Sequence, residues 1–287
     1  MTDLSCFKAY DIRGEIGVNI DEGVAYRVGR AVAQHLGATS VVIGFDARET
    51  SPAFAAAASR GVRDAGSDVI NIGMAGTEEM YWAVTEFGAC AGIEVTASHN
   101  PIHYNGMKIV KSQSQPLEDL GDFQAIKALA SSQAWSDVTD VGREFERSEA
   151  ARQAYVGRVL SFVDLPALRP LKIVVNSGNG AAGPTFDAIA DQLLELSAPL
   201  EFVRVHHTAD ATFPNGIPNP LLPENHAATA DVVKAEKADF GVAFDGDFDR
   251  CFFFDETGQF VPGEYVVGLL ASIFLEKEVG AKIVHDP

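Results

Sequence analysis

Two short segments, far apart in the chain, carry side chains that could together perform phosphoryl transfer. The first, residues 96–101, reads Thr-Ala-Ser-His-Asn-Pro and offers the hydroxyl of Ser98 as an acceptor. The second, residues 245–250, reads Asp-Gly-Asp-Phe-Asp-Arg and places three carboxylates at alternate positions. A hydroxyl that accepts a phosphoryl group, beside carboxylates that hold a divalent cation, suits this chemistry.

The serine segment has a plain interpretation and a functional one. An isolated Ser-His-Asn-Pro is most often a turn. Residues 94–97 read as the end of a strand, however, which would expose Ser98 at the carboxyl edge of a sheet, where α/β proteins place their sites. A Ser-His-Asp hydrolase is disfavoured, because neighbours on an extended chain point to opposite sides and no Gly-x-Ser-x-Gly is present. We therefore expect His99 to be a hydrogen-bonding neighbour of Ser98 and not its base.

The acidic segment predicts a metal site. Asp245, Asp247 and Asp249 repel one another unless they converge on a hard cation such as Mg²⁺. An EF-hand loop has the same opening spacing, but Arg250 stands where that loop requires glycine. A solvated acidic turn is the plain alternative, which the apolar residues 252–254 disfavour. Arg250 could offer a planar pair of donors to a phosphate.

Two further segments also have competing interpretations. Asn105-Gly106 is a tight-turn dipeptide that could fold Lys108 back towards Ser98, although a lysine on a strand more often lies on a solvated face. The glycine-rich residues 176–183 could cradle a phosphate at a helix N-terminus. They lack the Gly-Lys-Ser/Thr ending of a P-loop, so a structural strand-to-helix turn is favoured.

Apolar runs that read as strands alternate with helical periods around these segments, which predicts successive three-layer α/β domains with mixed, mostly parallel sheets. The expected strands are residues 40–45, 68–72, 171–175, 200–205, 239–244 and 282–285. Helices are expected near residues 78–84, 227–236 and 263–277, and from Ser51, whose hydroxyl would cap the helix before Pro52.

The polar residues 131–149 indicate a domain boundary, because they lack apolar periodicity. We expect a first domain at residues 1–147, which contains the serine segment, and a second domain at residues 148–254, which contains the acidic segment. Residues 255–287 would begin a third domain that stays incomplete, because one helix and one strand cannot enclose a core.

Composition and charge narrow the class of protein. Of 287 residues, 47% are hydrophobic and 22% charged, which is typical of a globular protein. The net charge of −18 disfavours nucleic acid or an anionic membrane as a partner. A small anionic substrate would need local cations, and Arg13, Arg48, Lys108 and Arg250 lie near the motifs. Three scattered cysteines and the lack of a long apolar run predict a soluble, cytoplasmic protein.

These motifs together resemble the α-D-phosphohexomutases along the whole chain. The resemblance is carried by Phe-Lys-Ala-Tyr-Asp-Ile-Arg-Gly at residues 7–14, the serine segment, Asn-Gly-Met-Lys at 105–108, the glycine-rich turn and the acidic segment. It implies a phosphoserine at Ser98, a hexose 1,6-bisphosphate that serves as intermediate and activator, and a hexose phosphate as the small-molecule substrate. Residues 7–14 are more similar to the corresponding segment of the mannose and glucose mutases than to that of the glucosamine mutases.

The resemblance also implies a role for each matched residue. The expected metal ligands of Mg²⁺ are Asp245, Asp247, Asp249 and Ser98 through its phosphate. The expected catalytic residues are Ser98, Lys108, which would move the hydroxyl proton, Arg13 and His99. The expected substrate-binding residues are Tyr10, Arg13, Asn100, Lys108 and Arg250.

Family members continue for many further residues, which bear loops that read the sugar and bind its distal phosphate, so this chain alone is expected to turn over poorly. Two other classes stay open. One is a haloacid-dehalogenase-type enzyme with Asp245 as phosphoryl acceptor, and the other is a fragment that binds Mg²⁺ and sugar phosphate without catalysis. The oligomeric state is left open.

Overall fold

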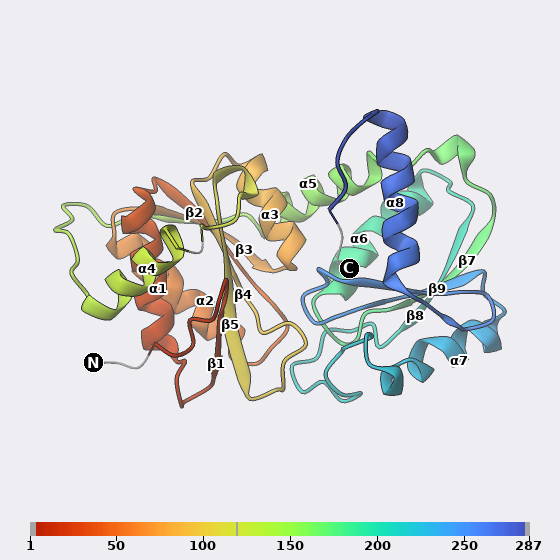
Figure 1. The fold of residues 1–287 in the computed structure, drawn as a ribbon, viewed down its shortest axis with the longest axis horizontal. Coiled ribbons are helices and arrows are strands. Elements are labelled where there is room, and N and C mark those ends of the chain that lie inside the picture. Colours follow the sequence, from red (N-terminus) through yellow and green to blue (C-terminus); the bar gives the residue numbers. More distant parts are fainter. Residues whose placement is uncertain (1–3, 119, 285–287) are drawn as a thin grey trace.

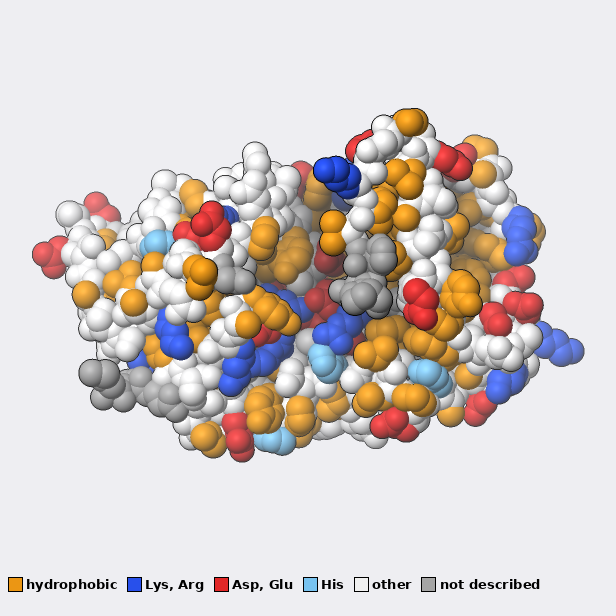
Figure 2. All heavy atoms as spheres, in the orientation of Figure 1, with side chains coloured by type: hydrophobic (Ala, Val, Ile, Leu, Met, Phe, Trp, Pro, Cys, Tyr) orange, Lys and Arg blue, Asp and Glu red, His pale blue; other side chains and the backbone are white. Residues whose placement is uncertain are grey.

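The structure is a computed structural model that describes residues 4–118 and 120–284. The chain forms two α/β halves, each built around a mixed sheet with helices on both faces (Figure 1). The expected fold class is thereby confirmed. Basic and acidic side chains gather in the hollow between the two halves (Figure 2).

The first sheet places the serine segment at its edge. Parallel β2 and β4 lie in the middle, and the antiparallel pairs β4–β5 and β5–β1 complete one side. The carboxyl ends of β2, β3 and β4 therefore share one edge of the sheet. In sheet order the strands are β1 (Ile12–Glu15), β5 (Tyr104–Lys111), β4 (Ala91–Val95), β2 (Ser40–Phe45), β3 (Asp68–Met74) and β6 (Glu144–Glu146).

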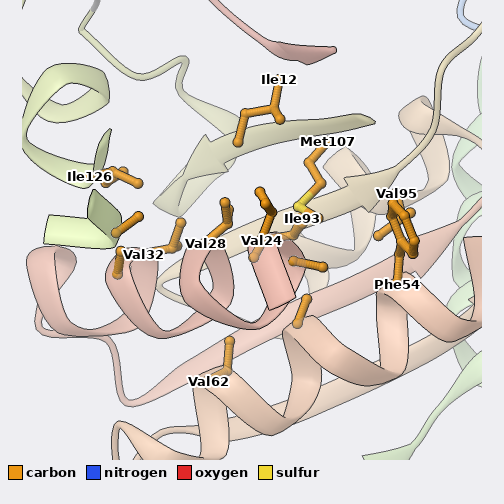
Figure 3. Close-up of a cluster of buried hydrophobic side chains, with 14 of the residues drawn as sticks. Ile12, Val24, Val28, Val32, Phe54, Val62, Ile93, Val95, Met107 and Ile126 are labelled. Carbon is orange, nitrogen blue, oxygen red and sulfur yellow. The ribbon is translucent and has the colours of Figure 1, made fainter. Parts of the chain in front are cut away.

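Helices cover both faces of this sheet. On one face pack α1 (Glu22–Leu36), α2 (Ser51–Asp64) and α4 (Asp122–Ser132). On the other pack α3 (Thr77–Glu86) and α5 (Ser148–Leu160). Figure 3 shows the first of these cores, whose buried side chains include Val28 of α1, Ile126 of α4 and Ile93 of β4. Burying each such side chain stabilises the fold by about 1.5–3 kcal/mol, and the packed strands hold their carboxyl ends in place.

The second sheet delivers the acidic segment. Its strands, in sheet order, are β11 (Phe260–Val261), β10 (Cys251–Phe254), β9 (Phe240–Phe244), β7 (Leu171–Asn176) and β8 (Leu200–Val205). Parallel β9, β7 and β8 end at one edge, and the acidic segment connects β9 to antiparallel β10. One face is covered by α7 (Ala227–Glu236) and the other by α6 (Ala182–Glu195).

The last helix, α8 (Gly263–Lys277), differs from the others because none of its residues is buried. It follows β11 and stands beside the second half in Figure 1. Short 3₁₀ turns complete the structure: η1 (Ser112–Ser114), η2 (Leu165–Ala167) and η3 (Pro223–Asn225). Within the described ranges, no helix is long and apolar enough to cross a bilayer.

Several local predictions are wrong. Asn105 and Gly106 lie inside β5 and make no turn, because Gly106 fits against the backbone carbonyl of Ile12, where a Cβ would clash. The hydroxyl of Ser51 donates to Asp46 and does not cap α2, whose N-cap is Thr50. Residues 282–284 are irregular and form no strand, while residue 285 lies outside the described residues.

The boundary regions contain pairings that the sequence pattern did not indicate. The polar residues 131–149 contain β6, which pairs with β3 of the first sheet. Beyond residue 254, β11 still pairs with β10 of the second sheet. The division at residues 147 and 254 stays a prediction.

Candidate functional site

The serine segment follows β4 and is covered by the second half of the chain. Ser98 is 1% exposed, so the expectation of an exposed hydroxyl is wrong. The cover includes Gly246, where a Cβ would lie only 2.6 Å from the carbonyl oxygen of Ser98. Glycine at this position therefore lets the acidic segment approach the serine backbone closely.

The hydroxyl of Ser98 has two partners. It donates to Oδ2 of Asp245 at 2.5 Å and lies 3.1 Å from Nδ1 of His99. The side chains of Ser98 and His99 were expected to diverge. This prediction is wrong, because Ser98 has a φ of 49° and the chain is not extended there. Burial lowers the pKa of His99, and the positive charges of Arg250 and Arg13 lower it further.

The acidic segment brings three carboxylates together. One oxygen each from Asp245, Asp247 and Asp249 lies within 4.8 Å of the others. Burial, assisted by the charge of Asp247, raises the pKa of Asp245 to about 7. Burial would also raise the pKa of Asp247, but the charge and hydrogen bond of Lys108 lower it to about 2.

The donor set fits a hard divalent cation. Oδ1 of Asp247 is buried and has no hydrogen-bond partner within the described part of the chain. An unpaired buried carboxylate oxygen is costly, and a cation held by several oxygens removes that cost. Strands flank this segment, where an EF-hand would have helices. The geometry therefore provides a candidate metal centre of three carboxylates.

Lys108 points into this cluster from β5. Its Nζ donates to Oδ2 of Asp247 at 2.6 Å, to Oδ2 of Asp249 at 2.5 Å and to Oγ1 of Thr77 at 3.2 Å. The solvated-face interpretation is wrong, since the side chain is 14% exposed. Burial would lower the pKa of Lys108, but the two carboxylates raise it above its ordinary value.

The remaining predicted residues lie at different distances from this centre. Arg250 places Nε 3.7 Å from Asp245 and 3.8 Å from Asp249. Arg13 pairs with Asp11 and donates to the carbonyl of Thr96 at 3.1 Å.

Two of the predicted substrate-binding residues, Asn100 and Tyr10, make few contacts with the rest of the site. Asn100 is half-buried in the serine segment, and its carbonyl accepts from Arg48. Tyr10 is 76% exposed and makes no hydrogen bond to the other predicted site residues.

Thr77, at the start of α3, also belongs to the site and was not among the predicted residues. Its N–H donates to the carbonyl of Asp247 at 3.1 Å, and its hydroxyl donates to Oδ2 of Asp247 at 2.8 Å. These bonds leave Oδ1 of Asp247 free for a cation. The position of Thr77 after β3, at the same sheet edge as the serine segment, was the available signal.

Asp46 and Arg48 both follow β2, and of these two only Asp46 was absent from the predicted residues. Asp46 accepts from Thr96 at 2.7 Å and from Ser51 at 2.6 Å. Arg48 was expected to be a cation for an anionic substrate, and this expectation is wrong. Its guanidinium is buried and donates to backbone carbonyls of the serine segment instead.

The glycine-rich turn supports the acidic segment from the side of the second sheet. The N–H of Ala181 donates to the carbonyl of Gly246 at 3.1 Å. Gly178 has a φ of 58°, and the side chain of Asn176 accepts from its N–H at 2.9 Å. These bonds favour the structural interpretation of this turn over the phosphate cradle.

Comparisons with known proteins agree with this arrangement. Residues 5–134 match the family model described as phosphoglucomutase/phosphomannomutase, alpha/beta/alpha domain I, and residues 153–258 match domain II of the same family. The chain is 52% identical to a phosphomannomutase of Salmonella montevideo over 287 residues and 50% identical to one of Escherichia coli K12 over 287 residues. Each alignment covers this whole chain but only 63% of the length of the relative.

A solved structure has the same fold. A phosphoglucomutase/phosphomannomutase family protein of Burkholderia thailandensis superimposes with a TM-score of 0.87 at 34% identity, over 98% of this chain and 61% of that one. The two family models, the identity to curated relatives and this fold show that the chain belongs to the phosphoglucomutase/phosphomannomutase family.

Proposed function

We propose that this chain performs the phosphoserine and metal-dependent steps of a phosphomannomutase, which interconverts mannose 6-phosphate and mannose 1-phosphate through a hexose 1,6-bisphosphate. The observation that carries the proposal is the contact between the Ser98 hydroxyl and Asp245 within a cluster of three carboxylates. The identity of 50–52% to curated phosphomannomutases supports mannose phosphate as the substrate. Because the chain spans 63% of those relatives, the activity of the whole protein is part of the proposal.

Ser98 is the proposed phosphoryl carrier. A bond between Oγ of Ser98 and the phosphorus of the bisphosphate forms as the bond from phosphorus to the sugar oxygen breaks, and the sugar monophosphate leaves. The serine proton has acceptors at hand, because Oδ2 of Asp245 and Nδ1 of His99 both lie within hydrogen-bond distance. The same transfer in reverse returns the phosphoryl group to the other hydroxyl of the sugar.

Asp245, Asp247 and Asp249 are the proposed ligands of Mg²⁺, with the Ser98 phosphate completing the set. Bound there, the cation would neutralise charge that develops on the transferring group. Arg250, near Asp245, and Arg13, which donates to the carbonyl of Thr96, supply positive charge near the serine segment. Lys108 is the proposed group that moves the sugar hydroxyl proton, and Tyr10 and Asn100 are proposed contacts to the substrate.

The substrate class is a small hexose phosphate, and glucose phosphate is a second candidate because the family description covers both sugars. The sequence has only three cysteines, far apart along the chain, and this supports a reducing, cytoplasmic setting. The acidic net charge supports a site without a nucleic-acid or membrane partner.

The function is tested by incubating the purified chain with Mg²⁺ and glucose 1,6-bisphosphate, and then mapping the phosphoryl group by peptide mass spectrometry. We expect a stable phosphate on Ser98. A phosphate on Asp245 would instead support the haloacid-dehalogenase type of reaction. Mg²⁺ binding without any phosphorylation would support the non-catalytic fragment.

A further inference from the structure

The guanidinium of Arg48 makes its hydrogen bonds to the backbone around Ser98. Nη2 donates to the carbonyls of Ser98 at 2.9 Å and Asn100 at 2.5 Å. Nη1 donates to the carbonyls of Pro101 at 3.0 Å and Tyr104 at 3.1 Å. Arg48 itself is 3% exposed. One buried side chain therefore gathers four carbonyls of the loop that carries the reactive hydroxyl.

Asp46 holds the other side of the same loop. Its Oδ1 accepts the N–H of Arg48 at 3.0 Å, and its Oδ2 lies 3.5 Å from Nε of Arg48. Oδ2 also accepts from the hydroxyl of Thr96, whose oxygen in turn accepts the N–H of Ser98 at 2.8 Å. The amide of Ser98 is thus held through Asp46 and its carbonyl through Arg48.

This holding is needed because the backbone of Ser98 is strained. Its φ of 49° lies in the left-handed region, which a residue with a side chain adopts at an energetic cost. The same conformation turns the hydroxyl towards both Asp245 and His99. Without the bonds from Arg48, the loop would lose the interactions that offset this cost.

Arg48 also connects the loop to the second half of the chain. Its guanidinium carbon lies 5.8 Å from the ring centre of Phe213, which is buried in the loop that follows β8. A guanidinium can bond in its plane and pack an aromatic ring on its face at the same time. The ammonium of a lysine cannot reproduce both.

We propose that Arg48 is the positioning residue for Ser98: it fixes the loop so that the hydroxyl meets the acidic segment, and the ring of Phe213 fixes Arg48. The consequence for phosphoryl transfer rests on the proposed function. The consequence for the loop itself does not, because the order of the loop can be measured without any substrate.

The test compares wild type, Arg48→Lys and Arg60→Lys, an exposed arginine of α2 that serves as control. Hydrogen exchange is followed in peptides from residues 97–104 and from α1 and β7, and Ser98 phosphorylation by glucose 1,6-bisphosphate is followed by intact mass. For Arg48→Lys we expect faster exchange confined to residues 97–104 and phosphorylation slower by about 10²-fold, the usual effect of a misplaced reacting group. Mg²⁺ affinity and the control should match wild type.

A second variant keeps the test decisive if Arg48→Lys does not fold. Phe213→Leu retains the four hydrogen bonds and removes the ring, so it should change loop exchange and phosphorylation in the same direction but less. Wild-type loop exchange in both variants, or in Phe213→Leu when it alone folds, overturns the proposal, as does faster exchange spread evenly over all peptides. If wild type is never phosphorylated, the proposed function fails, and loop exchange still decides the role of Arg48.

Discussion

The hydroxyl of Ser98 lies 2.5 Å from Oδ2 of Asp245, although 147 positions separate the two residues in the chain. The contact joins the carboxyl edge of the first sheet to that of the second, and Gly246 makes it possible by carrying no side chain. The two halves therefore form one site, in which a hydroxyl and a cluster of three carboxylates share a hydrogen bond.

Replacing Asp247 by Asn is expected to weaken Mg²⁺ binding at least about tenfold, because one of three carboxylates loses its charge. Isothermal titration calorimetry of the metal-free proteins measures the affinity. Asp231→Asn is the matched control, since the Asp231 side chain is 71% exposed on α7. Equal affinities for Asp247→Asn and wild type would place the cation elsewhere.

Replacing Lys108 by Met is expected to slow phosphoryl transfer from phosphorylated Ser98 to mannose 1-phosphate by about 10² to 10⁴, the usual contribution of a positioned proton-transfer group. Single-turnover rates at matched thermal stability provide the measurement. Lys234→Met, at an exposed lysine of α7, should leave the rate unchanged. An unchanged rate in Lys108→Met would assign the ammonium of Lys108 a purely structural role.

The buried carboxyl of Glu94, on β4, is expected to make the free energy of unfolding depend on pH. It is fully buried, and neither carboxylate oxygen has a hydrogen-bond partner among residues 4–118 and 120–284. Burial, then the charges of Asp46 and Asp247, raise the pKa of Glu94 well above its ordinary value. A carboxyl whose pKa rises on folding stabilises the fold fully below its unfolded pKa, and this contribution is lost as the pH rises through the folded pKa.

Glu94→Gln should therefore match wild type in free energy of unfolding near about pH 4, the ordinary pKa of glutamate, and exceed it increasingly at higher pH. Urea unfolding at a series of pH values measures the difference. Glu149→Gln, at an exposed glutamate of α5, controls for the loss of charge. A difference in free energy of unfolding that stays constant with pH would contradict a raised pKa of Glu94.

The exposed face of α8 is expected to make this 287-residue chain self-associate. Leu270 is 48% exposed and Phe274 is 56% exposed, and they lie one turn apart on the helix. Leu270→Glu combined with Phe274→Lys should reduce association and retain helix-compatible charges. Light scattering over a concentration series tests this, with Val141→Glu as control at an exposed valine outside α8. Concentration-independent mass in the unmodified chain would contradict the expectation.

The sequence predicted those parts of the fold that local patterns determine. The helices at residues 227–236 and 263–277 and the strands at 40–45 and 200–205 have the predicted bounds. The strand β6 was missed, since its three residues pair with β3 without an apolar pattern of their own. Asn105-Gly106 was misread because neighbouring strands, and not local turn preference, determine its conformation.

The sequence indicated which side chains of the site could react, but it did not indicate where those side chains point. The acidic segment and Ser98 were found from residue types and spacing alone. Whether Lys108 turns inward depends on carboxylates from the other half of the chain. The left-handed backbone of Ser98 depends on Asp46 and Arg48, which long-range contacts bring to the loop. No local pattern encodes either relationship.

The phosphorylation of Ser98 decides whether the serine and acidic segments together form a phosphoryl-transfer site. Wild type, Ser98→Ala and Ser136→Ala, an exposed serine used as control, are incubated with Mg²⁺ and glucose 1,6-bisphosphate and compared by intact mass. We predict that wild type and Ser136→Ala each gain one phosphoryl group and that Ser98→Ala gains none. A wild-type chain that never gains the group, or a Ser98→Ala chain that gains it equally, would contradict the account.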